Sequence, residues 1–237
     1  MSRVGSMEHD IVVHVWSDIA CPWCWIGKHR LEKGIEESGQ KVAVEYHAYQ
    51  LQPDAAAAVP FATSLSMKDF SADEVTEVLT STTELAADEG LAINWKNVTE
   101  VNTFLAHQLV YAAKARGETL EEAALLGARA VERLYFAHFT ECRNLADTDT
   151  LIEIAAELGL DPDDVSDELE SGEHSDSVRA DIASARSLGI EGVPFYVVGG
   201  KFGISGAQPA DVYADAIKRA VAEMQVSHAQ EVPLEQG

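Results

Sequence analysis

The residues with the clearest chemical potential are two cysteines, Cys21 and Cys24, separated only by Pro22 and Trp23 in the stretch IACPWCWIG. A close cysteine pair can exchange thiols and disulfides, bind a metal, or pack in an apolar interior. Exchange requires one sulfur that attacks as a thiolate and a second that can reach the resulting mixed disulfide. The role of the pair therefore depends on the elements that position it.

Two strand patterns and one helix pattern surround this pair. Residues 11–16, IVVHVW, form an apolar β-branched run, and residues 41–49, KVAVEYHAY, alternate apolar and polar positions. Between them, residues 22–37 have apolar side chains near helical spacing, and Gly39 supplies a stop. The sequence therefore predicts a strand–helix–strand unit with the cysteines at the first strand-to-helix junction.

This junction makes the two sulfurs unequal. Cys21 would lie at the start of the helix, where free N–H groups and the helix dipole stabilise a thiolate. Pro22 pre-sets the helical φ angle there. Cys24 follows one turn later, so we expect Cys21 to be the exposed nucleophile and Cys24 the recessed resolving thiol. Trp23 would cover the sulfur or offer an apolar platform to the substrate.

Two other roles for the pair are open. A structural zinc site needs about four ligands, of which the pair supplies two. Cys142 and a histidine could complete it, but the histidines show no ligand spacing, so we predict no metal site. An inert buried pair is the other alternative. A cysteine pair beside a strand–helix–strand pattern favours redox work over both.

The middle of the chain has only helix patterns, from residue 71 to about residue 188. Predicted helices follow capping-box patterns at Ser71-x-x-Glu74 and Asn97-x-x-Glu100, and a third starts near Thr119. Two shorter helices are expected at residues 148–158 and 175–188. Strand patterns return in VPFYVVGG and KFGIS, which flank a Gly199-Gly200 turn, and a last helix follows.

The order of elements is therefore β-α-β, a helical block, then β-β-α. This α/β order is the connectivity of a thioredoxin-like fold (βαβ–ββα) with an inserted all-helical domain. We assign residues 8–60 and 189–226 to the two parts of the thioredoxin-like domain. Residues 61–188 are assigned to the insertion and 227–237 to a tail.

A second motif, EGVPFY, points to the same site. In thioredoxin-like folds the proline that opens this strand is cis and faces the cysteine pair. Pro194 would then turn the chain so that the Val193 backbone can pair with an extended substrate segment. A trans proline at the start of a strand is the alternative.

Four segments together resemble the FrnE-like branch of the DsbA-like thiol–disulfide oxidoreductases. They are SDIACPWCWIGKHRLE, NTFLAHQLVYAA, LYFAHFTECRNLADTDTL and GIEGVPFYVVGGKFGISGAQ, and the resemblance spans residues 10–222. It implies disulfide oxidoreductase or isomerase activity in the cytosol, without a dissociable cofactor. Cys21 and Cys24 match the active-site pair, and Pro194 matches the cis-proline.

The same resemblance places Asn102 and His107 on an insertion helix that faces the site, as candidate substrate-binding residues. Packing or solvated positions are the alternative for both. A sister branch contains 2-hydroxychromene-2-carboxylate isomerases and kappa-class glutathione transferases, which generally have serine at the first position of the motif. Cys21 and Cys24 argue against glutathione-dependent isomerase or transferase work here, but glutathione remains possible as a reductant.

Composition excludes several partners. Forty acidic residues against 17 Lys and Arg give a net charge of −23, which repels nucleic acid and anionic membranes. No apolar run approaches the roughly 18 residues of a membrane span, and the N-terminus lacks a signal-like apolar segment. We expect a cytoplasmic monomer or homodimer that acts on protein or low-molecular-weight disulfides and thiols. The lone Cys142 is expected to be a free, half-buried thiol; a redox or dimer-linking role is the alternative.

Overall fold

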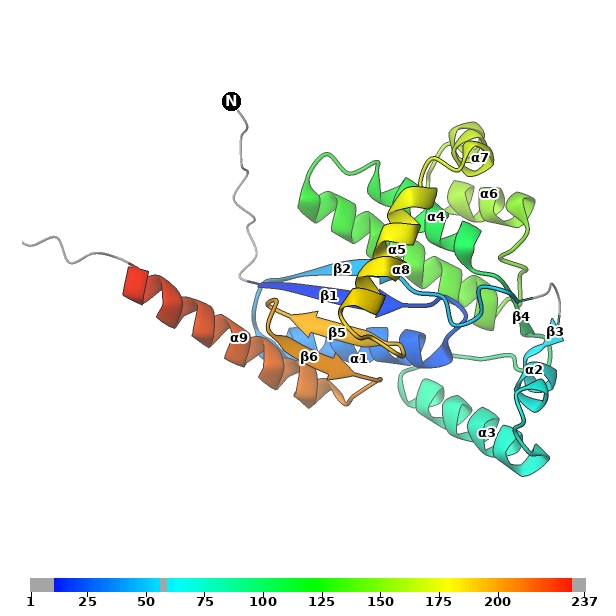
Figure 1. Ribbon diagram of the computed structural model, residues 1–237, viewed down its shortest axis with the longest axis horizontal. Helices are drawn as coiled ribbons and strands as arrows, with labels where there is room; N and C mark the ends of the chain where they lie inside the picture. The colour runs from blue at the N-terminus through cyan, green and yellow to red at the C-terminus, as the bar shows by residue number, and fades with distance from the viewer. Residues whose placement is uncertain (1–10, 56–58, 232–237) are drawn as a thin grey trace, which may run out of the picture.

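A mixed sheet forms the centre of the molecule (Figure 1). The computed structural model describes residues 11–55 and 59–231 of the 237-residue chain. Strand order in the sheet is β2-β1-β5-β6, with β1 and β2 parallel and the other neighbours antiparallel. The predicted first unit is confirmed as β1 (Ile11–Ser17), α1 (Pro22–Ser38) and β2 (Val42–Ala48). The helix α1 ends at Gly39, whose left-handed φ of 67° suits glycine.

The C-terminal part completes the sheet with the predicted hairpin. It comprises β5 (Phe195–Val198), β6 (Phe202–Ser205) and α9 (Ala210–Glu231). Helices α1 and α9 pack against each other, and in Figure 1 α1 passes behind β5 and β6. Gly34 permits this close approach, because a Cβ there would lie 2.6 Å from the Ala210 oxygen. Since α9 continues to Glu231, the predicted start of a tail at residue 227 is wrong.

Helices and one short β-ribbon make up the segment between β2 and β5. The ribbon pairs β3 (Val59–Pro60) with β4 (Thr99–Glu100) in antiparallel fashion. The helices are α2 (Phe61–Met67), α3 (Ala72–Asp88), α4 (Phe104–Lys114), α5 (Leu120–Phe139), α6 (Thr148–Glu157), α7 (Pro162–Ser171) and α8 (Ser175–Ser187). This arrangement confirms the thioredoxin-like α/β fold with a helical insertion.

Helix starts in this segment follow their local signals with one exception. The Ser71–Glu74 capping box is present, and the Thr119 side chain accepts from the Glu122 N–H. The predicted helix start at Asn97 is wrong, because Glu100 belongs to β4 and forms an ion pair with Lys68 at 2.7 Å, whereas the helix itself is present as α4. Helix α4 starts only at Phe104. The prediction also missed α2 and α7, although Asp161 and Pro162 provide a start signal for α7.

The hydrophobic core continues across the predicted domain boundaries. Trp25 of α1 stacks on Phe139 of α5 with ring centroids 5.8 Å apart, and it also contacts Tyr135. Side chains of β1 join the same cluster. The helical insertion therefore fixes the position of α1 directly. The boundaries at residues 60 and 188 stay predictions, while residues 8–10 and 232–237 lie outside the described residues.

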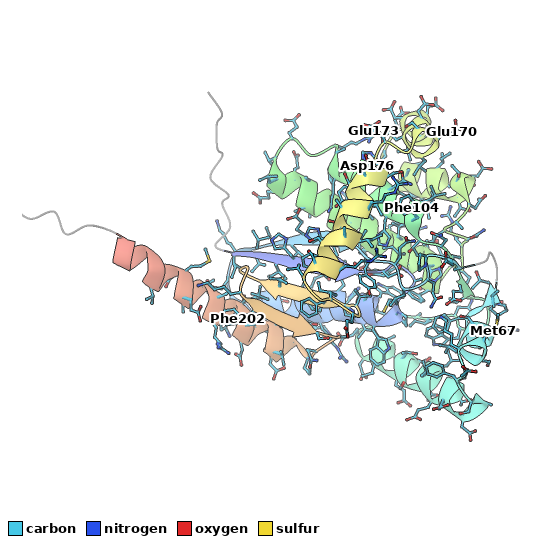
Figure 2. All side chains as sticks on the ribbon, in the orientation of Figure 1. Met67, Phe104, Glu170, Glu173, Asp176 and Phe202 are labelled. Atoms are coloured by element: carbon cyan, nitrogen blue, oxygen red, sulfur yellow. The ribbon has the colours of Figure 1, made fainter. Side chains whose placement is uncertain are left out.

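The surface is dominated by carboxylates. In Figure 2, Glu170, Glu173 and Asp176 project from the region of α7 and α8. Among the described residues, no helix combines the length and the apolar composition that crossing a bilayer requires.

Candidate active site

The two close cysteines lie at the β1-to-α1 junction, as predicted. Cys21 is the N-cap of α1, with extended backbone angles, and Pro22 occupies the first helical turn. The Cys24 N–H donates to the Cys21 carbonyl at 3.0 Å, and the Cys21 N–H donates to the Asp18 carbonyl at 3.1 Å. Both thiols are free. Cys21 is therefore beside the positive end of the α1 dipole, where an anion is stabilised.

The two cysteines have similar exposed fractions, but only Cys21 lines a groove. Cys21 is 4% exposed and Cys24 is 2% exposed, so the expectation of an openly exposed nucleophile is wrong. Cys21 nevertheless lines a groove of about 370 Å³, while Cys24 is not among the lining residues. Packing from the helical insertion buries the first cysteine, because α2, α3 and α5 all contribute to the groove wall. A substrate would reach Cys21 through this groove.

The predicted cis-proline is confirmed. The peptide bond between Val193 and Pro194 is cis, and it directly precedes β5. The Cys21 Sγ donates to the Val193 carbonyl at 3.7 Å. Residues more than 170 positions apart in sequence thus meet at one sulfur.

Mostly apolar side chains line the groove beside Cys21. Leu51 and Phe70 are 42% and 40% exposed on its wall, and the Lys68–Glu100 ion pair supplies polar groups. Pro22 and Trp23, both predicted to contact substrate, lie in this wall. The lining residues are Ala20, Cys21, Pro22, Trp23, Leu51, Gln52, Phe61, Leu65, Lys68, Phe70, Val78, Glu100 and His138. This composition suits an extended chain with a bulky apolar side chain.

His138 of α5 is a groove residue that the sequence analysis missed. Its side chain is buried, and its Nε2 has no hydrogen-bond partner among the described residues. Burial lowers the pKa of His138 to about 4, so the imidazole is neutral at pH 7. The residue stands in the quoted segment LYFAHFTEC, but only the packing of α5 brings it to the groove.

Cys24 lies in an environment that keeps it protonated. Burial raises the pKa of the Cys24 thiol well above its ordinary value, and its interaction with Cys21 raises it further. The negative charge of Asp18 adds to this effect. The two thiols therefore occupy separate roles, with Cys24 as a proton-bearing partner behind Cys21.

Asp18 is a buried carboxylate below the cysteine pair. Its oxygens accept hydrogen bonds from the Thr103 hydroxyl at 2.8 Å and the Leu51 N–H at 2.7 Å. Burial alone would raise the pKa of Asp18, but these donors and His107 hold it below its ordinary value. Asp18 is thus a fixed negative charge that joins β1, the loop after β2 and the start of α4.

Comparison with known proteins identifies the family of this chain. Residues 12–218 match the family of the DSBA-like thioredoxin domain. The chain belongs to this DSBA-like family. It is 30% identical over 207 residues to the uncharacterized protein YwbO of Bacillus subtilis (strain 168), covering 86% of this chain and 94% of YwbO.

Solved structures agree with the family assignment. A probable DsbA oxidoreductase from Streptomyces coelicolor superposes with a TM-score of 0.78 and is 33% identical, covering 96% of this chain and 94% of that one. The cytosolic disulfide reductase DsbM from Pseudomonas aeruginosa gives a TM-score of 0.56 at 19% identity, covering 92% and 99%. DsbM is also known in a form with GSH. At that identity DsbM supports the fold alone.

Two residues predicted to contact substrate have other partners in this DSBA-like chain. His107 is 4% exposed, and its Nε2 lies 3.0 Å from the Tyr49 carbonyl and 3.7 Å from Asp18. His107 does not line the groove and its ring lies beside Asp18, so substrate contact by His107 stays a prediction. Asn102 precedes α4, its Nδ2 donates to the Pro53 carbonyl, and its Oδ1 accepts from Gln50. These bonds give Asn102 a structural role, and it does not line the groove.

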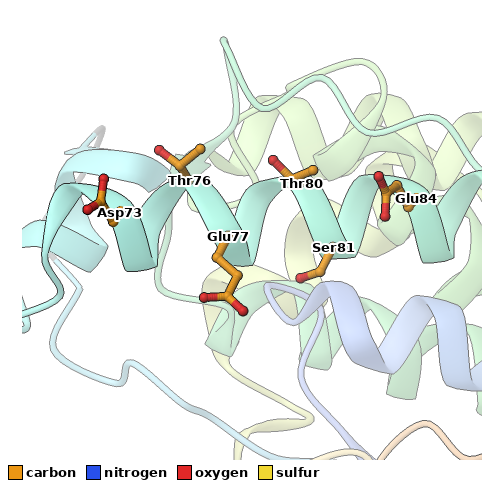
Figure 3. Close-up of a pocket in the computed structure, with 6 residues that line it drawn as sticks. All are labelled: Asp73, Thr76, Glu77, Thr80, Ser81 and Glu84. Carbon is orange, nitrogen blue, oxygen red and sulfur yellow. The ribbon is translucent and has the colours of Figure 1, made fainter.

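Other features lie away from the cysteine pair. Cys142 is half-buried and free, as expected, and its Sγ lies 3.6 Å from the Asn94 carbonyl. A separate hollow of about 400 Å³ follows α3 (Figure 3). Its lining comes from one helix and is polar, from Asp73 to Glu84. The groove at Cys21 is therefore the candidate site, because it combines a cysteine with apolar walls and that cysteine also contacts the carbonyl before the cis-proline.

Proposed function

We propose that this DSBA-like chain is a dithiol–disulfide oxidoreductase or isomerase that uses Cys21 and Cys24 in the cytosol. The observation that supports it best is the unequal placement of the sulfurs. Cys21 lies on the groove beside Val193 and cis-Pro194, and Cys24 lies one helical turn behind it with a raised pKa. No dissociable cofactor is needed, because the pair itself holds the two electrons.

In the first step, the Cys21 thiolate attacks one sulfur of a substrate disulfide. The substrate S–S bond breaks, and a mixed disulfide forms between Cys21 and that sulfur. The other substrate sulfur leaves as a thiolate and takes up a proton. The α1 dipole stabilises the attacking thiolate before the bond forms.

In the second step, Cys24 loses its proton and attacks the Cys21 sulfur. The Cys21–Cys24 disulfide forms, and the remaining substrate sulfur leaves as a thiolate that accepts a proton. Counted from the dithiol form, in which Cys21 still carries the proton that it releases on becoming a thiolate, the chain has lost two electrons and two protons and the substrate has gained the same. Run in reverse, the same steps oxidise a dithiol.

The residues that line the groove favour one class of substrate for this reaction. Leu51 and Phe70 offer apolar contacts, and the orphan Nε2 of His138 offers one buried polar contact. An extended peptide segment with a bulky apolar side chain near its cysteine satisfies both. Glutathione is a further small thiol for the pair, consistent with the GSH form of DsbM. The cytosolic assignment is supported by the same neighbour, DsbM, which is a cytosolic disulfide reductase.

Thiol trapping across a series of glutathione redox buffers tests the proposal. We expect the wild-type chain to form a reversible intramolecular disulfide that Cys21→Ser and Cys24→Ser both abolish. Cys142→Ser is the matched control and should leave that disulfide and catalysed insulin reduction intact. Absence of the disulfide in the wild type would refute the redox role. Glutathione conjugation that survives Cys24→Ser would instead indicate transferase or isomerase work, and bound zinc without insulin reduction would indicate a non-catalytic module.

A further inference from the structure

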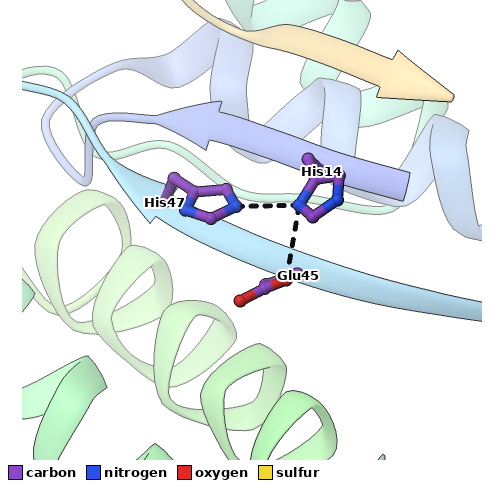
Figure 4. A group of neighbouring side chains, drawn as sticks. All are labelled: His14, Glu45 and His47. Carbon is purple, nitrogen blue, oxygen red and sulfur yellow. Dashed lines mark hydrogen bonds and ion pairs between the residues drawn. The ribbon is translucent and has the colours of Figure 1, made fainter. Parts of the chain in front are cut away.

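Three potential metal ligands meet on the sheet, away from the cysteine pair. The register of the parallel strands places His14 of β1 opposite Glu45 of β2, and His47 follows on the same face of β2. The His14 Nδ1 lies 3.0 Å from the His47 Nε2 and 3.3 Å from a Glu45 oxygen (Figure 4). One ligand atom from each residue lies within 4.8 Å of the others.

Asp181 fixes the orientation of the inner histidine. The His47 Nδ1 lies 2.7 Å from Asp181, which also accepts from the Tyr111 hydroxyl and the Ala48 N–H. A carboxylate that accepts from three donors holds the proton on His47 Nδ1, so the Nε2 lone pair accepts from the His14 Nδ1–H, whose proton a bound metal ion would displace. Trp16 stacks on the His47 ring with centroids 4.6 Å apart. A histidine held by a carboxylate through its other nitrogen is the usual arrangement behind a metal ligand.

The separations suit a small transition-metal ion. Ligands bound tetrahedrally at about 2.0–2.2 Å are separated from one another by roughly 3.3–3.6 Å. The 3.0 Å and 3.3 Å separations around His14 are close to this range, so small side-chain rotations suffice. Two imidazoles and one carboxylate form a donor set that binds Zn²⁺ and related divalent transition-metal ions better than it binds Ca²⁺ or Mg²⁺.

The cluster is also open on one side. The side chains of His14 and Glu45 are 35% and 46% exposed, while His47 is 14% exposed. A cavity of about 290 Å³ adjoins His14 and Glu45 and gives an ion a route of entry. Lys114 lines the same cavity, but its ammonium donates to the Tyr46 carbonyl and lies 4.5 Å from the Tyr111 ring centroid. The Lys114 charge also interacts with Glu45 and Asp181, so a bound divalent ion would share these carboxylates with it.

The geometry points to a divalent transition-metal site formed by His14, Glu45 and His47, with Asp181 as the positioning residue for His47. The proposed ion is Zn²⁺ or a close relative, and the site is separate from the thiol chemistry at Cys21. It would join β1 to β2 through their side chains. Because α1 follows β1 directly, bound metal would stabilise the element on which the cysteine pair rests.

Zinc titration tests the site, with the Cys21–Cys24 pair removed as a competing ligand set. In a Cys21→Ser/Cys24→Ser background, we expect one equivalent of Zn²⁺ to compete with a chromophoric chelator. His14→Ala and Glu45→Gln, both at outward positions, should each weaken binding at least about 10-fold, and Asp181→Asn about 10- to 100-fold. His29→Gln, which changes a histidine on α1, is the matched control and should bind zinc like the background.

A thermal readout separates binding from misfolding. The unfolding midpoint of the background variant should rise with Zn²⁺ concentration, whereas that of Glu45→Gln should not. Circular dichroism without metal checks that each variant folds, and the Co²⁺ visible spectrum of the background variant tests for nitrogen and oxygen ligands directly. The proposal is overturned if the background variant binds no zinc, or if His14→Ala and Glu45→Gln bind it unchanged.

Discussion

Glu132 of α5 holds the helix that bears the cysteine pair, and its replacement by glutamine gives a quantitative prediction. Its carboxylate lies 3.0 Å from the Trp25 indole nitrogen, 2.8 Å from the Lys28 ammonium and 3.1 Å from the His29 ring. All three donors belong to α1. Lys28 is 5% exposed, so loss of the Glu132 charge leaves it with Glu32 as its remaining ion-pair partner.

The size of the effect follows from the pKa of Glu132. Burial alone would raise this pKa, but His29, Lys28 and Trp25 lower it from 4.5 to about 2. At about 1.36 kcal/mol per pKa unit, this corresponds to an upper bound of about 3.4 kcal/mol. Because the side chain is 34% exposed, solvent screens part of that interaction. We expect Glu132→Gln to lower the free energy of unfolding at pH 7 by about 2 kcal/mol.

The depressed pKa of Glu132 also determines how the stability difference between wild type and Glu132→Gln changes with pH. A carboxyl whose folded-state pKa is depressed stabilises the folded protein above its unfolded pKa, and this contribution is lost as pH falls through the folded value. The stability gap between wild type and Glu132→Gln should therefore be full above about pH 5. It should shrink to less than half by about pH 3, because the unfolded carboxyl is already protonated there.

Urea unfolding followed by tryptophan fluorescence at several pH values measures this gap. Glu153→Gln is a matched control, because Glu153 is 73% exposed and pairs only at the surface with Arg143. Its effect should stay within about 0.5 kcal/mol at every pH. A Glu132→Gln gap below about 0.5 kcal/mol at neutral pH, or a gap that stays constant down to pH 3, would refute the reasoning.

Three further predictions concern the groove and its supports. Cys24→Ser should accumulate a mixed disulfide at Cys21 that mass spectrometry detects, because no second thiol resolves it; rapid turnover without accumulation would contradict this. His138→Leu removes the orphan imidazole and should raise the KM for peptide disulfides with little change in stability, as steady-state kinetics and thermal unfolding can show together. Gly27→Ala would place a Cβ against the Tyr196 hydroxyl and should destabilise the fold by about 1–3 kcal/mol in urea, and an unchanged midpoint would count against the packing.

Several site features were predictable because their signals are short-range. Cys21 and Pro22 stand next to each other at the end of an apolar run, so the helix start and the order of the two thiols follow from local chemistry. The same holds for the Ser71–Glu74 capping box, which satisfies backbone donors within one turn. The motif around Pro194 adds the one long-range feature that could be predicted, through its pattern.

Other features depend on contacts that local sequence does not encode. Asn97 has a helix-start pattern, yet Glu100 lies in the β3–β4 ribbon and pairs with Lys68 at the end of α2. His138 becomes a groove residue only because α5 packs against α1. The low exposure of Cys21 likewise results from helices that are distant in sequence.

The sequence by itself determined the helix that presents the thiols, the strands that flank it and the α/β order of the chain, because these follow from periodicity and neighbouring residues. The tertiary structure decided which side chains share a site. His14 and His47 are brought together by strand register, and Asp181 reaches them from α8. His14 and His47 are 33 residues apart and His47 and Asp181 are 134 apart, so no local spacing along the chain predicts that these side chains meet.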